Sequence, residues 1–184
     1  MTINACKSAH LLFAAAMVVG LTLFGISSGW AQDKQKYHFK TPPGASKYTQ
    51  QYVIDVGDVP GHQIRLYEIS SKYDTDAPMY DGVKVVESWL RATSDYVNGT
   101  GRASGYGVSH LANGDSIFSV SEIISQTKID QDGSKKGTFT TVTKLVGGTG
   151  KFMGIRGTLT NSGTTDFKTA TSDTVTEGEY WMEK

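Results

Sequence analysis

Carboxylates are the side chains of this chain best suited to carry chemistry. Four glutamates interrupt segments that otherwise resemble strands, namely Glu68, Glu122, Glu177 and Glu179. A glutamate buried in an apolar interior has a raised pKa and can act as a general acid or base near neutral pH. Glu179 precedes two aromatic residues that point to opposite faces of a strand, so one of these rings must face inward. Glutamates are seldom buried, however, and solvated edge positions are favoured for Glu177 and Glu179.

A second set of ionisable side chains lies in the segment Val83–Val97. If this segment is a strand, one face presents Glu87, Arg91 and Asp95 beside Trp89. Facing inward, these side chains could bind a ligand; facing outward, they would form a solvated row with the indole on the surface. The outward arrangement is favoured because ionised groups are rarely buried without partners.

The following segment, Thr100–Leu111, has small residues on one face. Such a face permits strong curvature or leaves room for a ligand. Tyr106 and His110 share the other face but stand about 13 Å apart along a strand, too far to act as a catalytic pair. No catalytic residue is therefore assigned, and the candidates for lining a ligand site are Glu68, Glu87, Trp89, Arg91, Tyr106, Glu122 and Tyr180.

Metal and nucleophile motifs are missing from the sequence. Three single histidines follow residue 31 without the spacing of a metal site, and the only cysteine is Cys6. The segment Asp130–Gly133 resembles the start of a calcium loop, but the closing acidic residue is missing, so a hairpin turn is expected. No GxSxG nucleophile motif occurs. We expect no bound metal and no cofactor.

The elements that must position these side chains are organised around a glycine-rich corner. Residues 146–158 contain five glycines, Gly147, Gly148, Gly150, Gly154 and Gly157. We expect one strand to end here, the next to begin, and Phe152 to close one end of a curved sheet. A phosphate-binding loop would need glycine at Leu145 and serine or threonine at Phe152, and a dinucleotide fingerprint would need glycine at Met153 and a following helix. Nucleotide binding is not expected.

This corner resembles a turn of a known superfamily. Gly147 to Phe152, with Gly154 and Gly157 behind them, are similar to the corresponding turn of the allene oxide cyclase and dirigent-like β-barrels and of related uncharacterised secreted bacterial proteins. The resemblance is clear over about a dozen residues and elsewhere concerns strand number and spacing. It implies a small calycin-like barrel with an inner cavity, and no catalytic residue of the family is carried over.

Alternating patterns and turn signals predict an all-β chain. Asn98–Gly99 is the clearest hairpin signal. About eight strands with short turns and no amphipathic helix indicate a single antiparallel sheet, either closed into a barrel or folded as a sandwich; closure is favoured because it removes exposed edges. The predicted strands are Tyr48–Val56, Gln63–Ile69, Val83–Val97, Thr100–Leu111, Ser116–Ile129, Gly137–Val146, Gly157–Phe167 and Thr171–Met182.

The N-terminal segment predicts export. Lys7 precedes an apolar run that ends in small residues before Ala31, which is typical of a signal peptide over residues 1–31. A polar lead, expected to be partly mobile, occupies residues 32–47, and the barrel domain occupies 48–184. The chain has 18 basic and 18 acidic residues, and Lys7 is the one charged residue within 1–31. Cleavage of the signal peptide would therefore leave 17 basic and 18 acidic residues, a net charge of −1. This charge favours neither nucleic acid nor stable membrane association; a homo-oligomer is left open.

Two function hypotheses follow. The first is a non-enzymatic secreted or periplasmic barrel that binds a small apolar or amphipathic ligand or serves as an envelope interaction module. The second, implied by the resemblance, is a cofactor-independent isomerase or cyclase in which Glu68 or Glu122 supplies one polar group. The first is favoured because likeness of fold says little about activity. A buried carboxylate near a Tyr or Trp would favour the enzyme.

Overall fold

The computed structural model describes residues 33–166 and 171–183. The predicted signal peptide lies outside the described residues, as does Phe167 at the end of one predicted strand. The elements are β1 (Gln35–Thr41), β2 (Ser46–Asp55), β3 (His62–Lys72), β4 (Met79–Tyr80), β5 (Val83–Val97), β6 (Thr100–Leu111), β7 (Ser116–Ile129), β8 (Lys135–Gly148), the 3-10 turn η1 (Gly150–Phe152), β9 (Ile155–Asp166) and β10 (Thr171–Met182).

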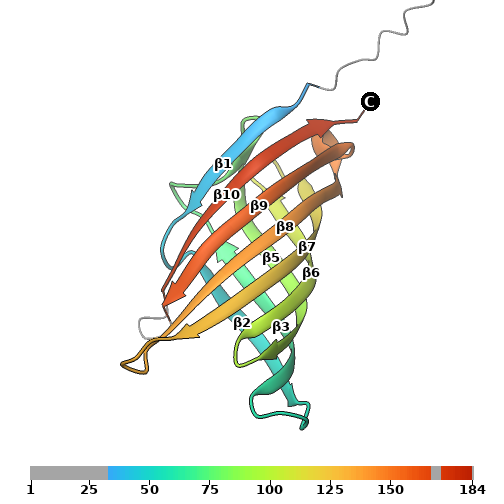
Figure 1. The fold of residues 1–184 in the computed structure, drawn as a ribbon. Coiled ribbons are helices and arrows are strands. Elements are labelled where there is room, and N and C mark those ends of the chain that lie inside the picture. Colours follow the sequence, from blue (N-terminus) through green and yellow to red (C-terminus); the bar gives the residue numbers. More distant parts are fainter. Residues whose placement is uncertain (1–32, 167–170, 184) are drawn as a thin grey trace, which may run out of the picture. The chain divides into compact units, whose positions relative to one another are not determined.

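The strands form one antiparallel sheet of ten strands. Their order is β1-β10-β9-β8-β7-β6-β5-β3-β2, with β4 paired to β5 beside this path. Figure 1 shows β1, β10, β9, β8 and β7 running side by side in that order. The prediction of an all-β antiparallel chain is confirmed for the described residues. The hydrogen-bonded path ends at β1 and β2, so the ladder itself does not close.

The hairpin at Asn98–Gly99 follows its sequence signal. Both residues have positive φ, 51° and 81°, which is the conformation that a two-residue turn between twisted strands requires. Asp81–Gly82, with φ of 45° and 78°, joins β4 to β5 in the same way. The predicted bounds of β5, β6 and β7 agree with the structure.

The polar lead expected over residues 32–47 contains a strand that the sequence did not predict, because Gln35–Thr41 forms β1. This strand pairs antiparallel with β10, with Tyr37 opposite Gly178. Its side chains alternate: Tyr37 is buried, whereas His38 and Lys40 are exposed. His38 contacts Glu177 at 3.1 Å and Lys40 contacts Asp173 at 3.1 Å, so charge pairs accompany the backbone ladder on the outer face.

The apolar core lies at the glycine-rich corner. Phe152 is fully buried, as the sequence predicts, and it packs with Ile117 and Ile155. Gly148 permits this packing, because a Cβ atom there would lie 2.5 Å from the Ser116 carbonyl oxygen and 2.7 Å from that of Phe152. The corner therefore closes one end of the inner face of the sheet.

Aromatic side chains connect β1, one end of the strand path, with β4 and with the segment that follows β3 near the other end. The ring of Tyr37 on β1 stacks on that of Tyr80 on β4 at 5.0 Å, and Phe39 on β1 meets Tyr73, just after β3, at 5.7 Å. The hydroxyl of Tyr180 accepts a hydrogen bond from the backbone N–H of Asp81 at 2.8 Å. The sheet is thus curled. Its seam, the gap between β1 at one end of the path and β2 and β3 at the other, is bridged by side chains.

A bulge in β5 explains why neither of its faces is apolar throughout. Val85 pairs with Leu111 on β6, but Glu87 pairs with His110, so Val86 is an extra residue. Such an insertion shifts the alternation of side chains. Val85 faces inward before the bulge, and Ala92 and Ser94 face inward after it.

Candidate functional site

The inner face of the sheet has an apolar end and a polar end. One line of cross-strand neighbours at the polar end runs from β3 to β1, and we call it the inner row. Arg65 begins it and Phe39 ends it. Its members, in order across the sheet, are Arg65, Ser94, Ala103, Ile123, Thr141, Asn161, Thr176 and Phe39.

Three polar atoms of the inner row are buried without a hydrogen-bond partner in the protein. They are Nε of Arg65, Oγ of Ser94 and Oδ1 of Asn161. Ser94 is only 3% exposed. Buried polar groups are almost always hydrogen-bonded, and an unpaired one destabilises the fold by about 1–3 kcal/mol. Three such atoms in a single row make the inner row the candidate site of this sheet.

Arg65 carries the only formal charge in the inner row. Its Nη2 donates to Oε1 of Gln63 at 2.6 Å, and Nε2 of Gln63 donates to Oδ1 of Asp55 at 2.9 Å. The side-chain amide of Gln63 therefore stands between Arg65 and Asp55. No salt bridge joins Arg65 to a carboxylate of the described residues. The charge is compensated only indirectly.

Tyrosine rings surround this arginine. Tyr67 and Tyr96 flank the inner row on neighbouring inward positions, and Tyr48 packs edge-on against Tyr67 at 5.5 Å. Burial raises the pKa of Tyr67 and of Tyr96, and the nearby positive charge of Arg65 opposes both shifts. Both phenols consequently stay protonated at neutral pH, so they can donate hydrogen bonds and offer apolar ring faces.

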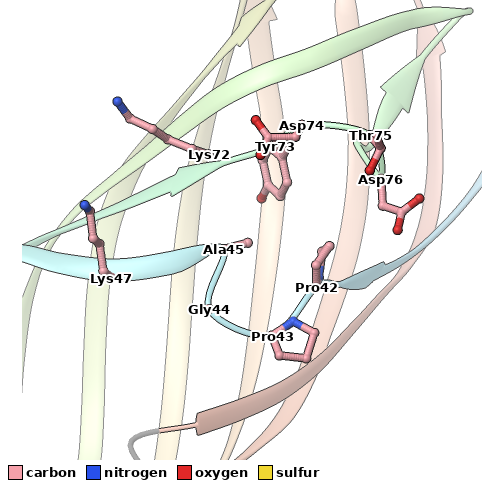
Figure 2. A pocket seen from close by; sticks show the side chains of 10 residues that line it. All are labelled: Pro42, Pro43, Gly44, Ala45, Lys47, Lys72, Tyr73, Asp74, Thr75 and Asp76. Carbon is pink, nitrogen blue, oxygen red and sulfur yellow. The ribbon is translucent and has the colours of Figure 1, made fainter.

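A pocket of about 400 Å³ lies at the seam of the sheet. It is lined by residues 42–45 between β1 and β2 and by residues 73–76 after β3. Figure 2 shows the Tyr73 ring in the middle of the pocket with Asp74 beside it, Lys47 and Lys72 on one side and the carboxylate of Asp76 on the other. Because Tyr73 packs on Phe39, the last residue of the inner row, pocket and row share one aromatic contact.

Six of the seven predicted ligand-lining residues lie on the outer face. Three of them are brought together: Nε of Arg91 lies 2.7 Å from Oε2 of Glu68, and the guanidinium stands 5.3 Å from the centre of the Trp89 ring. Thr49 also donates to Glu68 at 2.6 Å. Arg91 thus faces outward, as the sequence favoured for the charged side chains of Val83–Val97, while its partner Glu68 is only 13% exposed under the cluster; none of the three lines the interior.

The other candidates are dispersed. Glu87 pairs with Lys72 at 3.5 Å on the outer face, Glu122 is exposed, and Tyr106 is 74% exposed. Tyr180 is the one candidate that faces inward, but its hydroxyl already donates to Gln35 at 2.6 Å and accepts from the Asp81 amide. Tyr180 is thus a hydrogen-bonded part of the core.

Within residues 33–166 and 171–183, no three or more His, Cys, Asp or Glu side chains gather as they would around a metal ion. The same part of the chain has no helix of the length and hydropathy needed to cross a membrane.

No protein family, curated protein or solved structure matched this chain in the comparisons with known proteins. What the protein binds must therefore be inferred from its own geometry.

The residues that the sequence did not reveal are those of the inner row. The segment around Arg65 reads Ile64-Arg65-Leu66, which places the aliphatic residues inward by simple alternation. The structure has the opposite orientation, with Ile64 46% and Leu66 54% exposed. The only signal for Arg65 was its position in a strand next to Tyr67.

Proposed function

We propose that this protein is an exported binding protein that holds one small amphipathic molecule against the inner face of its curled sheet. The three unpartnered polar atoms of the inner row carry this proposal, because a bound molecule would satisfy them. The polar end supplies hydrogen-bonding groups, and the aromatic rings supply apolar contact, which together match a molecule with both kinds of surface.

The curled sheet acts in this proposal as a barrel whose seam is closed by side chains. Stacking of Tyr37 on Tyr80 and the edge contact of Phe39 with Tyr73 support closure without a backbone ladder. The seam pocket would then admit the ligand beside Tyr73, between the segment that joins β1 to β2 and the segment that follows β3. The glycine-rich corner, which resembles that of the allene oxide cyclase and dirigent-like barrels, forms the closed end.

Export follows from the predicted signal peptide over residues 1–31, and the proposal places the mature protein outside the cytoplasm, either secreted or periplasmic. An envelope interaction module is the broader form of the same proposal. N-terminal sequencing of the exported protein tests the export step, and a chain that begins at Gln32 is the expected result. Retention of Met1 on the exported protein would contradict it.

Native mass spectrometry of the purified protein tests the binding step. We expect a small-molecule adduct that is released on denaturation and that carries both a polar group and an apolar body. An Asn161→Leu variant, which replaces the unpartnered oxygen by a side chain of similar size, should lose the adduct. The matched control is Ser162→Leu, because Ser162 is the exposed neighbour on the same strand. An adduct retained equally by both variants, or no adduct, would refute the proposal.

The isomerase hypothesis has less support. It requires a buried carboxylate, and the buried polar residues of the described chain are serines and a threonine. Glu68 is paired with Arg91 on the outer face, and Glu122 is exposed. Conversion of the released molecule by the purified protein, abolished in both Glu68→Gln and Glu122→Gln, would be needed to restore this hypothesis.

A further inference from the structure

We infer that Arg65 binds a carboxylate or a similar oxyanion of the ligand, so that the molecule held by the inner row is a small organic acid with an aromatic or alicyclic body. This inference rests on the proposed function, and it adds the charge and the position of one ligand group.

The hydrogen bonds of the guanidinium point to this assignment. Nη2 donates to Gln63, whereas the buried Nε has no acceptor among the protein atoms. Arginine presents its N–H groups in a planar fork that matches the two oxygens of a carboxylate. An oxyanion beside Nε would use the free donor and a neighbouring N–H together.

Ser94 supplies a second donor at the same place. It is the cross-strand neighbour of Arg65 on β5, its hydroxyl oxygen is buried, and no protein atom accepts its hydrogen. A hydroxyl can rotate to donate to an anion, and a charged acceptor strengthens the bond. Two unpaired donors therefore belong to directly paired residues of adjacent strands, where Arg65 lacks a counterion.

Comparison with other arginines of the chain shows that Arg65 is different. Arg91 has a carboxylate oxygen of Glu68 at 2.7 Å, and Arg156 has one of Glu183 at 2.9 Å. The side chains of these two arginines are 57% and 35% exposed, so water can reach the guanidinium groups. A guanidinium with a buried, unpaired N–H is more costly to leave without an anion, so Arg65 has the strongest need for one.

The surrounding rings determine what the anion is attached to. Tyr48 packs edge-on against the buried Tyr67 and is itself 59% exposed, so it offers free aromatic surface near Arg65. Inorganic phosphate or another small hydrated anion would leave these faces without contact. An aromatic or alicyclic acid would cover the rings while its carboxylate meets the guanidinium.

The test uses benzoate and phenylacetate as charged probes and benzamide as the neutral one. Isothermal titration of the purified protein should give tighter binding of the acids than of the amide. Arg65→Gln should weaken binding of the acids about tenfold or more, which corresponds to loss of a charge-assisted hydrogen bond, and leave benzamide unchanged. Arg102→Gln is the matched control, because Arg102 is exposed on the outer face.

A spectroscopic measurement does not depend on any variant. Addition of benzoate to ¹⁵N-labelled protein should shift the Nε–H resonance of Arg65 downfield and leave that of Arg102 in place. The conservative Arg65→Lys variant should retain part of the preference for acids, since it keeps the charge but not the fork.

The outcomes separate this inference from the proposed function. If acids and benzamide bind equally well and both are lost in Asn161→Leu, the inner row is a binding site but the assignment of an anion to Arg65 is wrong. If the acids bind with no change at the Arg65 resonance, the assignment is also wrong. If neither probe binds and no molecule copurifies, both the anion and the proposed function are refuted.

Discussion

Nε2 of His62 lies 2.7 Å from Oδ1 of Asp95, and this contact ties the start of β3 to β5. The other ring nitrogen, Nδ1, lies 2.6 Å from Oδ1 of Asp58 in the turn that precedes β3. One imidazole thus bridges two carboxylates next to the turn that joins β2 to β3. Because a neutral imidazole has one N–H only, the bridge is complete only when the ring is protonated.

This bridge predicts a pH-dependent stability. Hydrogen bonding to Asp95 and then to Asp58 raises the pKa of His62. The stabilisation is therefore fully present below the unfolded pKa of histidine, about 6.5, and is lost as pH rises through the higher folded pKa. Hydrogen bonding to His62 lowers the pKa of Asp58, so on the acid side its part is lost as pH falls through that lowered value.

Thermal unfolding from about pH 4 to pH 9 checks this prediction. The difference in Tm between the unchanged protein and His62→Gln should be largest on the acid side of neutrality and should shrink at alkaline pH. His38→Gln is the control, because His38 and its partner Glu177 are both about two thirds exposed, at 67% and 68%. A His62→Gln difference that is constant with pH would show that the ring acts only by packing.

Truncation of Phe152 should destabilise the closed end of the sheet. Phe152→Ala removes a fully buried ring and leaves a cavity, for which we expect a loss of about 3–5 kcal/mol in the free energy of unfolding. Met153→Ala, at the adjacent and 72% exposed position, should change it by less than about 0.5 kcal/mol. Urea titration followed by tryptophan fluorescence measures both. Equal effects of the two variants would mean that the corner is not a core element.

The hydroxyl of Tyr180 should contribute to stability in addition to its buried ring. Tyr180→Phe leaves the backbone N–H of Asp81 without its acceptor and Gln35 without its donor. The expected loss is about 1–3 kcal/mol. Tyr106→Phe removes a hydroxyl at a 74% exposed position and should be nearly neutral. Chemical denaturation of the two variants side by side tests the difference, and a neutral Tyr180→Phe would contradict the hydrogen-bond assignment.

Ser94 should show opposite effects on stability and on binding. Ser94→Ala removes a buried hydroxyl without a partner, so the ligand-free protein should gain about 1 kcal/mol or more in stability. The same change should weaken binding of an acid probe, because a donor is lost. Ser104→Ala, at an exposed position on β6, serves as the control. If Ser94→Ala weakens both stability and binding, the hydroxyl has a structural partner instead.

Local signals were sufficient for most of the sheet. Turn chemistry at Asn98–Gly99 and alternation along β5, β6 and β7 predict these strands to the residue, because hairpin pairing is between neighbours in sequence. Strand β1 was missed although Tyr37 and Phe39 alternate with charged residues. It is short, lies before Pro42 and Pro43, and pairs with a strand about 140 residues away, which no local pattern reveals.

The orientation of faces was harder to predict than the strands themselves. In β3, alternation alone would place Ile64 and Leu66 inward, because neither Arg65 nor Gln63 has the character of an interior residue. Hydrophobicity identifies the inner face only where that face is an apolar core. At the polar end of this sheet the inward-facing residues include Arg65, Ser94 and Asn161. Their side chains are polar, so hydrophobic patterns in the sequence could not predict this site.

Val86 gives β5 one spare residue. Since Val86 is the position without a partner in the ladder, deleting it would leave Val85 and Ser94 both pointing inward. Deleting a single residue between Val86 and Ser94, with the bulge in place, would instead turn Ser94 toward solvent and bring Asp95 into the interior beside Arg65. Loss of one residue in this strand is therefore best tolerated at the bulge, and a deletion that leaves the bulge in place exchanges the two faces of the residues beyond it.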